Sequence, residues 1–283
     1  MQTFGLALGG GGARGLAHIG YLEVLDELRL TPVVVSGCSM GAVIGALYAA
    51  GTTGADIRTL FEERLPRRGG TLRSTGLWLK SLARNLARLG PELRHSGLVN
   101  TDSLVDSLLA PLDGCTFADL ATPLVVVATD FWSGEGVVIE KGPLLPAIKA
   151  SMAIPGLVHP CEVDGRILVD GGLTNVLPYG PLLDRCDLTI AIDVSGDRRP
   201  EEGGHMPNSM DASIGAIEIL QSALLREQLR QSAPDLLVSP ALRSIGLLDF
   251  AKAHEIRVQS EPSWKEFPDR LARLGLVPQR PAP

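Results

Sequence analysis

Two short apolar runs near the amino terminus are each followed by glycines and then by a helical pattern. Residues 4–8 end in the glycines at 9–12, after which apolar residues recur every three positions from Leu16 to Leu28. A β-branched triplet at 33–35, a glycine turn at 37–41 and a run of small apolar residues repeat the order of strand, turn and helix. Two such units in succession predict a parallel sheet covered by helices.

Apolar runs further along the chain predict the remaining strands. Each run is short, aliphatic or β-branched, and bounded by turn-forming residues or by a helical segment. We expect buried strands at 124–128 and 188–194 and a hairpin partner at 137–139. A tight turn at 163–166 should lead into a strand at 167–169, and a helix around 214–230 should precede a last strand at 236–238.

The composition excludes several classes of protein. Hydrophobic residues make up 45% and charged residues 20% of the 283 residues, which excludes an overall disordered chain. A net charge of −6 and few aromatic residues (Phe 6, Trp 3, Tyr 3) argue against a nucleic-acid partner. The four cysteines form no CxxC pair, so neither a zinc site nor a disulfide framework is indicated. No basic leader precedes the first apolar run, and we therefore expect a cytoplasmic protein.

One segment, residues 64–94, differs from the rest of the chain in charge. It contains eight basic residues and one acidic residue, Glu92. Leu79, Leu82, Leu86 and Leu89 fall on one helical face, so the segment has the composition of a basic amphipathic helix. Two interpretations stay open: a helix packed on the domain with a solvated basic face, or a lid or membrane-surface helix that gives peripheral contact with the inner membrane face.

The glycine turn after the second strand carries a GxSxG motif, with Ser39 between Gly37 and Gly41. A nucleophile on a strand-to-helix turn needs strained dihedrals, and glycine at both flanking positions lets the two backbones pass without Cβ clashes. The turn raises the Ser39 hydroxyl above the sheet edge, where the amino terminus of the next helix favours developing negative charge. The placement predicts a nucleophilic serine.

The first turn, Gly10–Gly15, satisfies G-x-G-x-x-G, which is typical of dinucleotide binding. That function requires an acidic residue at the end of the second strand to bind the ribose hydroxyls, and none is present. The alternative is a cradle of backbone N–H groups that stabilises an oxyanion, with Arg14 anchoring the loop or adding positive potential.

A serine nucleophile needs a base, and the sequence offers two kinds. His205 and His254 follow Ser39 in the chain, but neither lies in a context that favours catalysis. Asp170 ends an apolar strand and is followed by Gly171 and Gly172, which let the chain turn away at once. Because open parallel sheets place their sites at the carboxyl ends of strands, we expect Asp170 to be the partner of Ser39.

Four motifs in this order resemble the patatin-like phospholipase family: GGGxRG at 10–15, GxSxG at 37–41, ASMAIPG at 150–156 and DGG at 170–172. The resemblance implies a three-layer α/β/α sandwich with a mainly parallel central sheet. It covers roughly the first 195 residues. We therefore expect a catalytic domain over 1–195 that carries the 64–94 insertion, and a helical extension over 196–283 packed on the same domain.

The resemblance also implies a reaction. The family hydrolyses acyl esters of phospholipids, lysophospholipids or neutral lipids through a Ser-Asp dyad, and it needs neither histidine, metal nor cofactor. Carried over to this chain, Ser39 is the nucleophile, Asp170 is the general base and Gly10, Gly11 and Gly12 form the oxyanion loop. The supporting motif residues are Arg14, Gly15, Gly37, Gly41, Gly171 and Gly172, and the 151–156 block, Asn175 and Pro178 help to shape the site.

Two other functions compete with a lipid acyl hydrolase. A catalytically idle lipid-binding or regulatory protein of the same fold is disfavoured by the intact Ser39 and Asp170. A nucleotide-binding oxidoreductase rests on Gly10–Gly15 alone and is disfavoured by the missing acidic residue.

Overall fold

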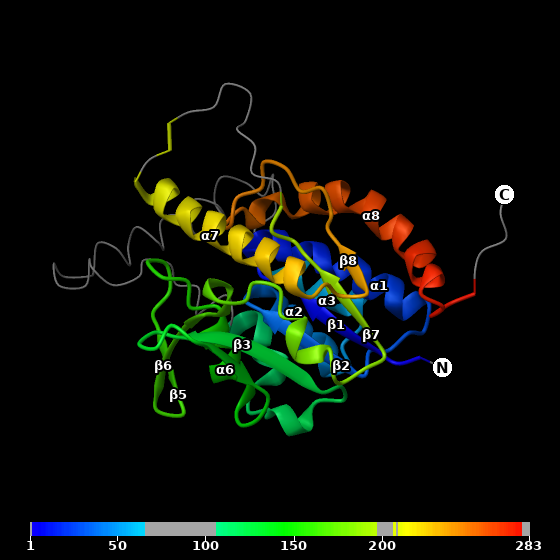
Figure 1. Cartoon of the computed structure of the whole chain (residues 1–283), viewed down its shortest axis with the longest axis horizontal. Helices are drawn as coiled ribbons and strands as arrows, with labels where there is room; N and C mark the ends of the chain where they lie inside the picture. The colour runs from blue at the N-terminus through cyan, green and yellow to red at the C-terminus, as the bar shows by residue number, and fades with distance from the viewer. Residues whose placement is uncertain (1, 66–105, 197–205, 208, 279–283) are drawn as a thin grey trace.

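The computed structural model describes residues 2–65, 106–196, 206–207 and 209–278 (Figure 1). Its α-helices are α1 (His18–Glu27), α2 (Met40–Ala49), α3 (Gly54–Arg64), α6 (Leu144–Ser151), α7 (Ser209–Gln231) and α8 (Ala253–Arg273). Its strands are β1 (Phe4–Leu8), β2 (Val34–Cys38), β3 (Leu124–Asp130), β4 (Gly136–Ile139), β5 (Cys161–Val163), β6 (Arg166–Asp170), β7 (Leu188–Ile192) and β8 (Leu236–Val238).

The strands form one mixed sheet in the order β5-β6-β3-β2-β1-β7-β8, with β4 also paired to β3. β1, β2, β3, β7 and β8 run parallel, which confirms the parallel sheet predicted from the two amino-terminal units. β4 and β6 run antiparallel to β3. The turn between β5 and β6 contains Asp164 and Gly165, both with positive φ, so the predicted tight turn is also confirmed.

Helices cover both faces of this sheet. Leu6 and Leu8 of β1 belong to one core cluster, and Ala7 between them belongs to a second. Alternate side chains of a strand point to opposite faces, so the two clusters lie on opposite sides of the sheet. The first cluster includes residues of α1, α2, α3, α6 and α8, and the second includes Leu225 of α7, which crosses the front of the sheet in Figure 1. The predicted α/β/α sandwich is confirmed.

The carboxyl-terminal part of the chain adds to the same sheet and the same core. β8 pairs with β7, and α8 packs across α1. The indole of Trp264 lies against Gly20, where a Cβ atom would be 2.2 Å from the ring. Its N–H donates a hydrogen bond of 3.1 Å to the carbonyl of Ala17. A side chain at Gly20 would therefore separate α8 from α1.

Most of the basic segment, residues 66–94, lies outside the described residues. Its first two residues are described: Arg64 ends α3, and Leu65 is buried. The Arg64 guanidinium donates to the carbonyl and the hydroxyl of Ser107, so the chain returns close to where it leaves. Both interpretations of the segment remain predictions. Within the described ranges, no helix combines the length and the hydrophobicity needed to cross a membrane.

Candidate active site

Ser39 lies in the turn between β2 and α2 with an unusual backbone conformation. Its φ is 51° and its ψ is −123°. Residues with a side chain rarely adopt a positive φ, and such strain concentrates at functional sites. β2 ends at Cys38 and α2 begins at Met40, so a single residue makes the turn from strand to helix. This is the geometry of a nucleophile elbow.

Gly37 and Gly41 permit this turn because no side chain fits at either position. A Cβ atom on Gly37 would lie 2.6 Å from the Cα atom of Ala42, and one on Gly41 would lie 2.2 Å from the carbonyl oxygen of Leu8. Both neighbours are backbone atoms, which cannot move aside without moving their strand or helix. The close passage of β1, β2 and α2 therefore requires glycine on both sides of Ser39, as the motif predicts.

Asp170 also lies near the carboxyl ends of the parallel strands, but the direction of its own strand differs from the expected one. The sequence suggested a strand parallel to its neighbours, but β6 runs antiparallel to β3. Asp170 pairs with Ala128, and the preceding residue of β3, Val127, pairs with Cys38. β6 therefore enters the sheet at the carboxyl edge of the parallel strands and ends level with the residues that precede Ser39.

Ser39 and Asp170 line one cavity together with the loop of Gly10, Gly11 and Gly12. Both side chains are almost completely buried. The other lining residues are mostly apolar and come from distant parts of the chain: Ile154, Pro155, Leu173, Val176, Ile214, Ile217 and Leu247, with the polar Glu218 and Gln221. The fold thus brings a hydroxyl, a carboxyl and a glycine loop against an apolar wall.

Burial raises the pKa of Asp170 from 3.8 to about 6, because the charged carboxylate loses its hydration in the apolar cavity. Two hydrogen bonds oppose the rise. The N–H of Gly172 donates to the carboxylate at 2.7 Å, and the Ser39 hydroxyl also donates to it. Asp170 is therefore a stronger base than an exposed aspartate and is still ionised at neutral pH.

The three glycines of the first turn have different hydrogen bonds. The N–H of Gly10 donates to the carbonyl of Val176 at 2.8 Å, so it is already engaged. The N–H groups of Gly11 and Gly12 donate to no acceptor within the described part of the chain. Gly12 has a φ of 55°, and a Cβ atom there would lie 2.2 Å from the carbonyl oxygen of Leu247. Two free N–H groups thus remain in the cavity lining.

Arg14 anchors this glycine loop to the rest of the molecule. Its side chain is buried, and its guanidinium donates to Glu218 of α7 at 2.7 Å and to the carbonyl of Ile245 at 3.1 Å. Of the two roles suggested by the sequence, the anchoring role is the one that these contacts support. Glu218 also lines the cavity, so the ion pair ties α7 to the loop beside Ser39.

The other motif glycines mark close contacts around the pair. A Cβ atom on Gly15 would lie 2.5 Å from the Met40 side chain, directly after Ser39. One on Gly171 would lie 2.3 Å from the carbonyl oxygen of Val127. Gly171 therefore lets the chain leave Asp170 without pushing β3 away. A Cβ atom on Gly172 would lie 2.4 Å from the amide nitrogen of the Gln221 side chain in α7.

Ser151 is a buried residue whose role the sequence did not reveal. Its hydroxyl accepts a hydrogen bond of 2.8 Å from the backbone N–H of Ser39 and interacts with the Cys38 thiol. The ASMAIPG block placed this serine near the site, but no local pattern pointed to the Ser39 backbone as its partner.

We expect Ser151→Ala to destabilise the fold by about 1–3 kcal/mol, because it leaves the N–H of Ser39 buried without an acceptor. Urea unfolding would measure the change. Ser222→Ala is a matched control, since among the described residues that hydroxyl bonds only to the carbonyl of Glu218 in the same helix. Equal stability of the two variants would contradict a role for Ser151 in holding the elbow.

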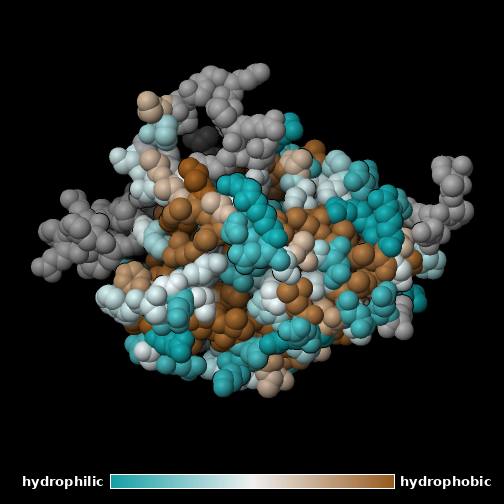
Figure 2. All heavy atoms as spheres, in the orientation of Figure 1, coloured by the Kyte–Doolittle hydropathy of each residue, from teal (hydrophilic) through white to brown (hydrophobic). Residues whose placement is uncertain are grey.

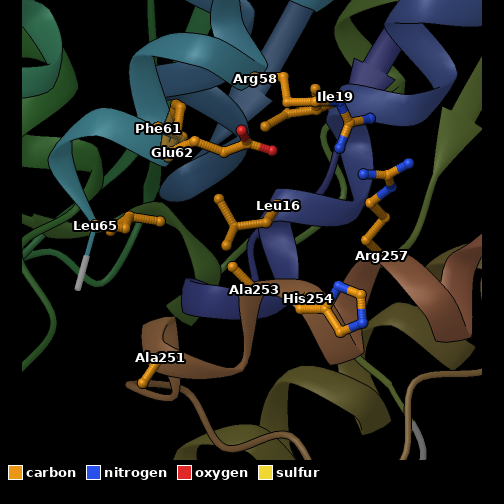
Figure 3. Close-up of a pocket in the computed structure, with 10 residues that line it drawn as sticks. All are labelled: Leu16, Ile19, Arg58, Phe61, Glu62, Leu65, Ala251, Ala253, His254 and Arg257. Carbon is orange, nitrogen blue, oxygen red and sulfur yellow. The ribbon is translucent and has the colours of Figure 1, made fainter. Parts of the chain in front are cut away.

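None of the described histidines lies in the cavity of Ser39. His18 is buried, its pKa is lowered to about 4 by burial, and it donates to the carbonyl of Gly9. His254 lines a separate cavity of about 320 Å³ between α1, α3 and α8 (Figure 3). His205 lies outside the described residues. Within the described ranges, no group of three His, Cys, Asp or Glu side chains is arranged to hold a metal ion.

Known proteins match this chain over most of its length. An uncharacterized NTE family protein of Mycobacterium bovis is 36% identical over 222 residues, which cover 75% of this chain and 56% of that protein. Lysophospholipase NTE1 of Candida glabrata is 26% identical over 99% of this chain, but over only 17% of its own length. The chain thus spans about half the length of the first relative and a small part of the second. VipD from Legionella pneumophila aligns with 94% of this chain and 67% of its own, with 15% identity and a TM-score of 0.47.

The family model described as patatin-like phospholipase matches residues 6–183. This range holds the glycine loop, the elbow at Ser39 and the strand that ends at Asp170. The resemblance drawn from the motifs is therefore confirmed, and the chain belongs to the patatin-like phospholipase family.

Proposed function

We propose that this chain is a serine hydrolase that cleaves carboxylic esters of phospholipids, lysophospholipids or related lipids through a dyad of Ser39 and Asp170. One observation carries the proposal: a hydroxyl and a carboxyl of raised pKa share a buried cavity and a hydrogen bond. The apolar wall of that cavity suits an acyl chain. Membership of the patatin-like phospholipase family supports lipid ester hydrolysis as the class of reaction.

In the first half of the proposed reaction, the Ser39 oxygen bonds to the acyl carbon while Asp170 takes the hydroxyl proton. The electron pair of the carbonyl double bond moves to its oxygen. The N–H groups of Gly11 and Gly12 and the amino-terminal end of α2 stabilise this negative charge. The ester bond then breaks, Asp170 returns the proton to the departing alcohol oxygen, and the acyl group stays on Ser39.

In the second half, a water molecule replaces the alcohol. Asp170 takes one of its protons as the water oxygen bonds to the acyl carbon, and the same N–H groups stabilise the new oxyanion. The bond between the acyl carbon and Ser39 breaks, and the proton passes from Asp170 to the serine oxygen. The products are a fatty acid and the regenerated enzyme.

The two alternatives make different use of the same residues. A catalytically idle lipid-binding protein has no need of a carboxylate of raised pKa beside a strained serine. A dinucleotide-binding enzyme needs an acidic residue at the end of β2, where this chain has Ser36, Gly37 and Cys38. The features that carry the hydrolase proposal are thus the ones that these alternatives leave unexplained.

Covalent labelling tests the proposal directly. We expect an alkyl fluorophosphonate to label the wild-type protein and Ser232→Ala, which alters an exposed serine, but not Ser39→Ala. Phosphatidylcholine and lysophosphatidylcholine should release fatty acid, which mass spectrometry detects. Lipid binding without labelling would favour the idle protein, and NAD binding without labelling would favour the oxidoreductase.

We also expect His159→Ala and His254→Ala to hydrolyse a p-nitrophenyl ester within about twofold of the wild-type rate, because neither side chain lines the cavity of Ser39. Steady-state kinetics with each variant would measure this. Loss of turnover in either one would replace the dyad by a mechanism with a catalytic histidine.

A further inference from the structure

Two aromatic side chains project into solvent from the turn between β3 and β4. Trp132 is 80% exposed and Phe131 is 51% exposed. Their rings pack edge to face, with centroids 4.9 Å apart. Exposing large apolar side chains to water side by side is energetically unfavourable. Such patches mark surfaces that bind a partner.

The turn holds these rings in place. The Asp130 carboxylate accepts hydrogen bonds from the N–H groups of Trp132 at 3.0 Å and Ser133 at 3.1 Å. The N–H of Phe131 donates to the carbonyl of Ile167 in β6 at 2.9 Å. The aromatic pair therefore lies on a turn whose backbone is held by hydrogen bonds to the Asp130 carboxylate and by one hydrogen bond to β6.

The aromatic pair lies beyond the carboxyl ends of the parallel strands, as Ser39 does. Val127 of β3 is level with Cys38, the residue before Ser39, and the two strands are parallel. β3 continues for three more residues to Asp130, and a strand advances about 3.3 Å per residue. The turn therefore starts about 10 Å beyond the level of Cys38, on the side that the elbow faces.

A second exposed apolar surface lies on α7. Ile219, Leu220 and Leu224 are exposed, with Leu220 at 63%. The same helix contributes Ile217, Glu218 and Gln221 to the cavity of Ser39. Residues three, four or seven apart are neighbours on a helix, so Leu220 and Leu224 border the side of α7 that lines this cavity. An ordinary surface helix turns its apolar face inward, whereas α7 also exposes an apolar stripe. Figure 2 shows brown atoms along α7 on this side of the molecule.

We propose that these two elements form one interfacial surface that docks on a phospholipid bilayer. The interfacial surface consists of Phe131, Trp132, Ile219, Leu220 and Leu224. Tryptophan prefers the boundary between acyl chains and headgroups, and aliphatic side chains enter the adjacent apolar region. This inference rests on the proposed function, because a bilayer at this surface brings acyl esters to the edge that holds Ser39.

A bilayer fits the interfacial surface better than a second copy of the chain does. β3, which leads into the aromatic turn, and α7 both contact the turn at Gly171–Leu173 that follows Asp170. A second protein chain there would cover the surroundings of the cavity that its substrate must reach. A lipid surface would instead supply the substrate at that place.

Vesicle binding tests the inference independently of catalysis if every variant also carries Ser39→Ala. We expect the parent to co-sediment with phosphatidylcholine vesicles, and Trp132→Ala and Leu220→Ala each to lower the partition coefficient by about tenfold or more. Val33→Ala is the matched control. Val33 is 40% exposed, but it precedes β2 and so lies at the amino-terminal ends of the parallel strands, away from Ser39. This variant should bind like the parent.

Fluorescence gives a second readout. The chain has three tryptophans, of which Trp264 is buried and Trp132 is exposed. Vesicles should shift the emission of the parent protein to shorter wavelength, and Trp132→Phe should lose most of that shift. Circular dichroism would verify that each variant is folded.

Three results would overturn the inference. In the first, Trp132→Ala and Leu220→Ala bind vesicles as tightly as Val33→Ala does. In the second, binding requires anionic lipid and disappears at high salt, which would assign it to the basic segment 64–94. In the third, the parent sediments as a dimer and these variants as monomers, which would make the surface an interface between copies. Failure of the proposed function would appear separately, as loss of fluorophosphonate labelling in a protein that has kept Ser39.

Discussion

Ser39→Ala is expected to fold like the wild-type protein and to hydrolyse a soluble p-nitrophenyl ester on the order of 10⁴-fold more slowly. The change removes the only atom that can form the acyl-enzyme in the proposed reaction. It leaves the strained backbone, the glycine loop and Asp170 in place. Burst kinetics on the wild-type protein and steady-state rates on the variant would measure the effect.

Ser232→Ala provides the control for this substitution, because it deletes an exposed hydroxyl just after the end of α7. It should retain the wild-type rate. A thermal melt would show whether Ser39→Ala is folded. If the folded Ser39→Ala protein kept more than about a tenth of the wild-type rate, the nucleophile would have to be another residue.

Asp170→Asn is expected to abolish turnover to a similar extent, because an amide cannot take the Ser39 proton. The wild-type protein should show the matching pH dependence. Its kcat/KM should be constant above about pH 6, where Asp170 is ionised, and should fall about tenfold per pH unit below it. A pH profile with a soluble ester measures this directly. An Asp170→Asn protein with the same rates and profile as the wild type would exclude Asp170 as the base.

The same substitution should stabilise the fold at neutral pH. Burial raises the pKa of Asp170 from 3.8 to about 6, so between these values the folded protein binds more protons than the unfolded chain. The free energy of unfolding therefore falls as pH rises through this window, by up to roughly 3 kcal/mol. Asparagine does not ionise, and its side-chain oxygen can still accept the hydrogen bond from Gly172.

Urea unfolding at pH 4 and pH 8 would separate the two effects of Asp170→Asn. We expect the variant to be more stable than the wild type at pH 8 and to differ little from it at pH 4. Asp184→Asn, at an exposed position, removes the same charge from the surface and should change stability little at either pH. A variant less stable than the wild type at pH 8 would contradict the burial penalty on Asp170.

The strand and turn positions could be predicted because their causes are local. The runs that become β1, β2, β3 and β7 are apolar at consecutive positions, as buried strands must be when helices cover both faces. The glycines around Ser39 reveal a turn in which a side chain would strike backbone atoms. Such patterns reflect the environment of a few neighbouring residues, and they also identified Ser39 and Asp170 as candidates.

The contacts between distant segments could not be predicted in the same way. The direction of β6 depends on its pairing with β3, which no periodicity within β6 specifies. The acceptor for the N–H of Gly10 is Val176, and the partner of the Ser39 N–H is Ser151. Hydrogen bonds of this kind join residues far apart in the chain, so each depends on the relative placement of whole elements.

The amino-acid sequence by itself determined the apolar strands β1, β2, β3 and β7, the elbow at Ser39 and the membership of the family, because hydrophobic spacing and the need for glycine depend on residues that are neighbours in the chain. The tertiary structure alone decided that Asp170 shares a cavity with Ser39 and that its pKa rises to about 6. It also decided that the outer face of α7 stays exposed. Burial and proximity arise only when elements distant in the chain pack together, since both depend on which atoms exclude water from a group.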